Sequence, residues 1–174
     1  MKNVRSLCYL VCFFHTQPLL AADTTENATK AIGVSAGLLS GIGFAYRTYA
    51  PDEESANHFG GIAYGDDQTL FFNLAYEHLN YLSQFGKSRL AWFSGVSNFF
   101  LHDTSETWNL SSVGAGIAFE YGEKKGFNLI FELPLSFGVE YQKIPASSQL
   151  DKANSENIKF KMSPIPAGML LYRF

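Results

Sequence analysis

The sequence predicts an all-β fold, a single antiparallel up-and-down barrel that crosses a membrane with eight strands. Along most of the chain, apolar and aromatic residues alternate with small or polar ones, which is the period of a β-strand. Phe, Tyr and Gly are abundant, with 16, 9 and 15 residues. After the N-terminal segment there is no apolar run long enough for a transmembrane helix. A strand between lipid and a polar lumen has this alternation, whereas soluble up-and-down barrels place their apolar side chains inside.

Eight segments carry the alternation in order, and turn signals separate them. Ser40-Gly41, Gly86 and the charged residues 122–126 mark tight turns, and residues 142–157 should form one long polar loop. An even number of strands places both termini of the chain on the periplasmic side. The expected strands are residues 32–38, 42–49, 59–64, 69–81, 89–100, 109–121, 127–138 and 158–174.

Prolines make two parts of this threading less regular. Pro134 falls on the lumen side of its strand and should break the ladder locally, and Pro164 and Pro166 interrupt the last strand. If residues 32–49 form one strand instead of two, a turn near Pro134 or Pro164 must restore the even count.

The N-terminal residues predict a secretory signal peptide. Lys2 and Arg5 precede an apolar run at residues 7–14, and small residues follow at Ala21 and Ala22. We expect cleavage after Ala22, a flexible leader at residues 23–30 and the barrel at residues 31–174.

Removal of the signal peptide would change the chemistry available to the mature chain. Both cysteines, Cys8 and Cys12, lie inside the signal, so the mature chain would have no thiol chemistry. Loss of Lys2 and Arg5 changes the net charge from −3 to −5. An acidic chain without a basic cluster argues against a nucleic-acid partner.

The last residues end on Phe174 with Tyr172 two positions before it, so both aromatic side chains share one face of a strand. This ending resembles the C-terminal strand of bacterial outer-membrane β-barrel proteins. The resemblance implies a location in the outer membrane and contact with the barrel-assembly machinery during biogenesis. It also implies that Tyr172 and Phe174 form the assembly signal.

The lumen side of the predicted strands carries balanced charges. An unpaired charge in a dry lumen is very costly, so equal numbers of acids and arginines at similar height predict a network of ion pairs. Arginine suits such a network because its planar fork holds two carboxylates. The expected members are Arg47, Glu77, Arg89, Glu120, Glu132 and Arg173.

Residues that could perform catalysis are few. His58, His78 and His102 have no metal spacing, so we expect no metal and no cofactor. The chain is similar in size to the lipid A deacylases, whose motif places a serine two residues after the catalytic histidine. Asn80 occupies that position after His78, so the nucleophile is absent and we expect no enzymatic activity.

These observations predict an integral outer-membrane barrel, similar in architecture to the small OmpA/OmpX-type barrels. Side chains fill a barrel of this size, so a wide pore is excluded. We expect a monomer in outer-membrane lipid, with a structural role or a surface interaction through its loops. A narrow channel gated by the lumen charges and a lipid-modifying barrel enzyme stay open as alternatives.

Overall fold

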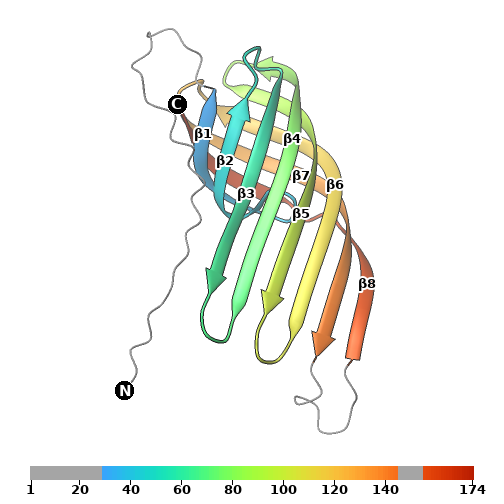
Figure 1. The fold of residues 1–174 in the computed structure, drawn as a ribbon. Helices are drawn as coiled ribbons and strands as arrows, with labels where there is room; N and C mark the ends of the chain where they lie inside the picture. The colour runs from blue at the N-terminus through green and yellow to red at the C-terminus, as the bar shows by residue number, and fades with distance from the viewer. Residues whose placement is uncertain (1–28, 145–154) are drawn as a thin grey trace, which may run out of the picture.

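A computed structural model describes residues 29–144 and 155–174 of the chain. They form an all-β, closed antiparallel up-and-down barrel of eight strands with one additional strand (Figure 1). From β1 to β8 each strand pairs with the strands next to it in the sequence, and β9 closes the barrel by pairing with both β1 and β7 instead of β8. The strands are β1 (Lys30–Gly37), β2 (Gly41–Tyr49), β3 (Ser55–Gly65), β4 (Leu70–Phe85), β5 (Ser88–His102), β6 (Thr107–Gly122), β7 (Gly126–Ile144), β8 (Ser155–Ser163) and β9 (Ala167–Arg173).

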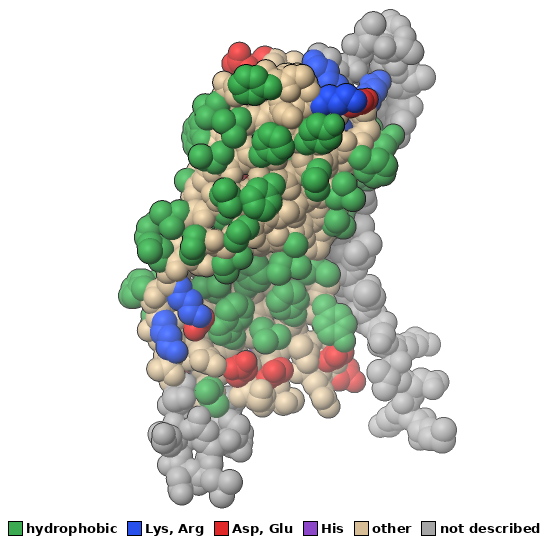
Figure 2. Space-filling view, turned by 180° about the vertical axis from the view of Figure 1, so that it is seen from behind, with side chains coloured by type: hydrophobic (Ala, Val, Ile, Leu, Met, Phe, Trp, Pro, Cys, Tyr) green, Lys and Arg blue, Asp and Glu red, His purple; other side chains and the backbone are tan. Residues whose placement is uncertain are grey.

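The alternation in the sequence becomes two faces of the barrel wall. In β7 the even-numbered residues from Asn128 to Glu140 are buried, whereas Phe127, Leu129 and Phe131 are exposed on the outside. The other long strands repeat this arrangement, so large apolar side chains cover much of the outer surface (Figure 2). No helix in the described part of the chain is long and apolar enough to cross a membrane.

The final predicted strand, residues 158–174, is two strands in the structure. Pro164 and Pro166 end β8 and precede β9, and both strands pair with β7. Pro134 lies on β7 between the segment paired with β9 and the segment paired with β8. The prediction that Pro134 breaks the ladder is therefore wrong toward β6, where Pro134 pairs with Gly116. On the other edge of β7 the ladder is interrupted at Pro134, since pairing with β9 ends at Glu132 and pairing with β8 begins at Ser136.

Several strands are longer in the structure than the sequence predicted. β3 begins at Ser55, inside residues that looked like a polar break, and β4 continues to Phe85 past a bulge near Leu82. β7 reaches Ile144, which shortens the predicted loop at residues 142–157. β1 begins at Lys30, so the last residue of the predicted leader belongs to the barrel. The predicted signal peptide lies outside the described residues.

The turn between β1 and β2 folds into the lumen. Leu39 and Ser40 are fully buried there, although they belong to a turn. The carbonyl oxygen of Ser40 lies 3.1 Å from Nε2 of His58 on β3. A Cβ atom on Gly60 would lie 1.9 Å from that same oxygen, so only glycine leaves room for the turn. The turn therefore forms a plug at the height where β1 and β2 end.

Candidate functional site

The predicted charge network exists as a buried cluster inside the closed part of the barrel. Its centre is Arg47, whose side chain is completely buried on the lumen face of β2. Nη1 of Arg47 donates a hydrogen bond of 3.2 Å to Glu120, and Nη2 lies 3.6 Å from the carboxylate of Glu132. The guanidinium fork thus joins acids from β6 and β7 across the lumen.

Glu120 is the most connected acid of this cluster. It accepts hydrogen bonds from both Arg47 and Arg89. The hydroxyl groups of Tyr49 and Tyr81 donate to the same carboxylate at 3.1 and 2.6 Å. Four donors from three strands converge on one buried carboxylate, which compensates for the loss of its hydration.

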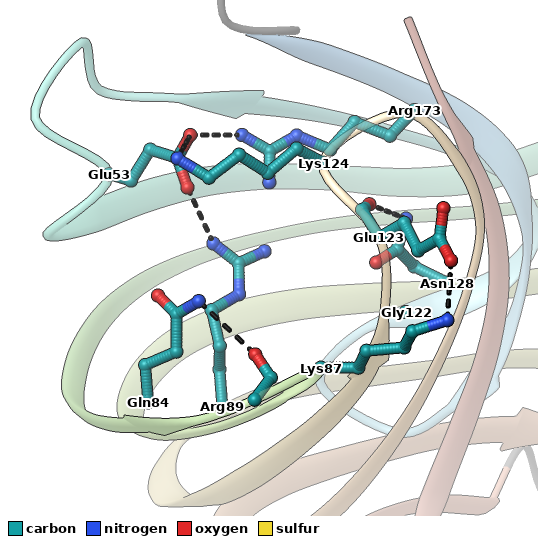
Figure 3. A pocket seen from close by; sticks show the side chains of 10 residues that line it. Glu53, Gln84, Lys87, Arg89, Gly122, Glu123, Lys124, Asn128 and Arg173 are labelled. Carbon is teal, nitrogen blue, oxygen red and sulfur yellow. Dashed lines mark hydrogen bonds and ion pairs between the residues drawn. The ribbon is translucent and has the colours of Figure 1, made fainter.

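A second cluster lies at the end of the barrel that holds the C-terminus. Glu53, in the turn between β2 and β3, lies 3.1 Å from Arg173, 3.1 Å from Lys124 and 3.5 Å from Arg89 (Figure 3). Glu53 has a backbone φ of 60°, which is uncommon for a residue with a side chain. The three ion pairs of the Glu53 carboxylate help to stabilise this strained backbone conformation of the turn.

Aromatic rings support the arginines of both clusters. The guanidinium carbon of Arg173 lies 3.9 Å from the ring centroid of Tyr49, and that of Arg89 lies 4.3 Å from the ring of Tyr81. Tyr49 and Tyr81 stack with centroids 6.5 Å apart. Cation–π contacts of this kind fix the planes of the guanidinium groups and so aim their donors at the acids.

Two of the expected ion pairs are different in the structure. Glu77 is fully buried as predicted by parity, but among the described residues its carboxylate forms no ion pair with an arginine and faces Glu132 instead. Arg173 pairs with Glu53, which was not among the predicted residues. Glu53, Glu77, Glu120 and Glu132 thus face the three arginines and Lys124.

The mouth of the barrel beside Glu53 contains a small pocket (Figure 3). Its volume is about 20 Å³, which is room for about one water molecule. On its exposed rim, Lys87 binds Glu123, and the hydrogen bond between them lowers the pKa of the Glu123 carboxyl and raises the pKa of the Lys87 ammonium. The pocket therefore offers polar contacts to a water-sized molecule.

The remaining predicted residues lie elsewhere. Tyr172 and Phe174 are on the outer surface, where the Tyr172 ring contacts Phe127 edge-on at a centroid distance of 5.2 Å. His78 binds the side chain of Asn57 at 2.9 Å. Among the described residues, no group of three or more His, Cys, Asp or Glu side chains could hold a metal ion.

Sequence reasoning missed the residues whose position depends on turns or on the ends of strands. Glu53 lies in a polar turn, where strand parity gives no direction for a side chain. Tyr49 and Tyr81 have the parity of Arg47 and Glu77, so their inward direction was available from the pattern. The burial of Leu39 could not be predicted, because an apolar residue in a turn does not indicate that the turn folds into the lumen.

The fold and this site define a class: a closed eight-stranded β-barrel with a buried charged network and an apolar outer surface. No protein-family model, curated protein or solved structure matches the chain. The class therefore comes from the chain's own strands and side chains.

Proposed function

We propose that this protein is an integral outer-membrane β-barrel with a filled lumen, and that it acts as a structural or surface-interaction protein. We assign the protein no catalytic role, because Asn80 stands where a deacylase would need its serine. We further propose that outer-membrane lipid surrounds the protein, that it works as a monomer and that Tyr172 and Phe174 form the assembly signal.

One observation carries the proposal: the polarity of the barrel is reversed relative to a soluble barrel. Charged and polar side chains such as Arg47 and Glu132 are buried in the lumen, whereas Phe127, Leu129 and Leu133 are exposed outside. Exposure of these apolar side chains to water would be unfavourable in free energy, whereas contact with lipid would not be.

The height of the closed wall also fits a membrane. Each residue of a strand tilted by about 40° adds about 2.5 Å of height. The nine residues of β2 and the eight of β1 therefore cover about 20–23 Å, close to the apolar band of about 25 Å in outer-membrane barrels. The parts of β3 to β8 that continue farther would extend beyond the hydrocarbon.

A narrow channel is the second candidate, because the lumen carries charges in two clusters along its axis. The filled centre and the small pocket at the mouth favour a closed lumen. Conductance in planar bilayers separates the two candidates: the structural proposal expects none above background, and steady single-channel currents would overturn it.

The membrane location has its own test. After osmotic shock and membrane fractionation, the protein should be in the outer membrane, and on a gel it should migrate differently before and after heating. Recovery of the protein among soluble periplasmic proteins would contradict the proposal.

A further inference from the structure

The barrel wall is complete at only one end. β2 pairs with β3 no farther than Gly61, so residues 62–65 of β3 have a ladder with β4 alone. Among the described strands, β8 pairs only with β7. The end of the barrel away from the C-terminus is therefore an open trough between β3 and β8, which the lower half of Figure 1 shows.

The concave face of this trough is apolar and accessible. Ile62 and Tyr64 have the parity of the buried residues His58 and Gly60, yet 44% and 54% of their surfaces are exposed. Phe71, paired with Tyr64, is partly buried. Lumen-facing side chains in the closed half are almost completely covered, so the exposure follows from the missing wall.

The floor and back of the trough continue the apolar surface. Phe99 on β5 and Leu110 on β6 lie opposite each other in the register and are nearly buried. Leu39, at the tip of the inward turn, approaches Gly114 of β6 and closes the end of the trough that adjoins the closed half of the barrel. Figure 2, seen from the open side, shows hydrophobic side chains across the lower half of this face.

One side of the trough carries positive charge. Lys159 and Lys161 on β8 pair with Glu140 and Gly138 and therefore point to the concave side. Glu140 binds Lys161 and also accepts a hydrogen bond from Trp108. Two ammonium groups thus face the Glu140 carboxylate, whereas the next carboxylate on this side, Glu106, binds the side-chain amide of Gln142. Figure 2 shows basic side chains, Lys or Arg, at the margin of the apolar face.

We propose that the trough binds a free long-chain fatty acid, with its hydrocarbon chain on the apolar face and its carboxylate at Lys159 and Lys161. The chain would cover the exposed side chains of Ile62, Tyr64 and Phe71. A protein strand added to the edge of β8 would leave these side chains of β3 and β4 uncovered. This binding site goes beyond the proposed structural role, and it does not require the protein to be in a membrane.

The two tryptophans of the chain allow a direct test. Trp108 has the parity of Leu110 and faces the trough, whereas Trp92 is exposed on the outer surface. The W92F variant leaves Trp108 as the reporter, and the W108F variant leaves Trp92. Both detergent-solubilised variants are titrated with dibromostearate, whose bromines quench tryptophan fluorescence on contact.

Quenching of Trp108 should saturate and should be reversed by unbrominated stearate. Quenching of Trp92 should follow partition into the detergent, rise without saturation and resist the competitor. If Trp108 behaves like Trp92, the trough binds no fatty acid and the proposal is overturned.

Variants on opposite faces of the wall locate the site. In the W92F background, Ile62→Asn should raise the half-saturating dibromostearate concentration about tenfold, because it removes apolar contact. Ile158→Asn on the outward face of β8 is the matched control and should leave it unchanged. Lys159→Glu should weaken stearate and leave stearyl alcohol unaffected. Equal effects of the two asparagine variants would overturn the assignment.

Phospholipid is tested separately in nanodiscs with brominated acyl chains. Quenching of Trp92 there reports insertion into the bilayer and so tests the proposed membrane role alone. Quenching of Trp108 by brominated phospholipid, without saturable binding of dibromostearate in detergent, would mean that membrane lipid occupies the trough. That result would overturn the proposal of a free fatty acid.

Discussion

Glu120 connects the two clusters of the lumen. Its carboxylate binds Arg47 in the central cluster and Arg89, which also contacts Glu53 at the mouth. Removal of this charge would leave two buried arginines with fewer acids and two tyrosine hydroxyls with a weaker acceptor. The energetic cost of such a change is mainly the cost of the unpaired charges that remain.

Replacement of Glu120 by Gln should therefore destabilise the barrel strongly. Loss of one partner from a buried ion pair costs roughly 3–5 kcal/mol, so the variant should unfold at clearly lower urea concentration in lipid or detergent. Glu123→Gln is the matched control, because the same chemical change then affects an exposed pair with Lys87. Equal midpoints for Glu120→Gln and wild type would show that the Glu120 charge does not support the fold.

Acid should weaken the hydrogen bonds to the Asp66 carboxylate at the tip of the loop between β3 and β4. The backbone N–H of Gln68, the hydroxyl of Tyr64 and the N–H of Thr69 donate to Asp66 and lower the pKa of its carboxyl. A lowered folded pKa means that the stabilisation is present above the unfolded pKa of about 3.9. It is lost as the pH falls through the folded value.

The amide NMR shifts of Gln68 and Thr69 should therefore stay constant down to about pH 4 and change below it. In Asp66→Asn this change should disappear, whereas Asp67→Asn should keep it. Amide shifts that titrate in Asp66→Asn as they do in wild type would assign the transition to another group.

At the residue scale, strand parity was sufficient to place side chains that lie within strands. Arg47, Glu120 and Glu132 are buried in the lumen because inward and outward positions alternate in a strand. Parity gave no information about which inward residues meet, since that depends on the stagger of neighbouring strands. Glu53 shows the same limit, because a turn with a positive φ has no period.

At the element scale, the hairpin of β1 and β2 has two roles. Its strands complete the wall of the closed half, and its turn closes the lumen through Leu39 and Ser40. The hydroxyl of Ser35 donates to the Ser40 carbonyl oxygen at 3.2 Å, and the N–H of Ile42 donates to the Asn73 side chain at 2.7 Å. The turn is therefore held to the wall on both sides.

Substitution of Gly60 by Ala should push this turn out of place. The new Cβ would collide with the backbone oxygen of Ser40, which cannot rotate away as a side-chain end could. Overpacking of this kind costs typically about 1–3 kcal/mol. Gly168→Ala is the control, because the nearest atom to its Cβ lies at 4.0 Å. Urea midpoints should fall for Gly60→Ala alone, and equal stability of both variants would contradict the packed turn.

Deletion of Phe174 tests the role of the last strand in assembly. The ring is half exposed on the outside, so its burial in lipid contributes only about 1–3 kcal/mol to stability. Loss of a recognition signal would instead remove most of the protein from the outer membrane in cells. Normal amounts of the deletion variant in the outer membrane would contradict the assembly role of Phe174.

At the scale of the whole molecule, alternation predicted the barrel, its eight-strand order and its reversed polarity. It did not predict that the wall is open over half of its height. The sequence predicted that β1 and β2 are short. Whether short strands leave the wall open depends on the stagger with which β9 pairs with β1 and with β7. Such long-range pairing is set by barrel closure and not by local pattern.

The closed half has two barriers in series, and conductance should show both. The charged cluster around Arg47 and Glu120 fills the lumen on one side, and the Leu39 turn closes it on the other. Wild type, Arg47→Ala and Leu39→Ala should each carry no ions in planar bilayers, because one barrier remains in every case. The double variant removes a guanidinium and a buried isobutyl group from the same lumen, so it should conduct.

Leu39→Ala alone should lower the free energy of unfolding by roughly 2–5 kcal/mol, so circular dichroism must first show that each variant is folded. Conductance of the folded single variant Arg47→Ala would mean that the charged cluster is the gate of a narrow channel, and a silent folded double variant would mean that other side chains close the lumen.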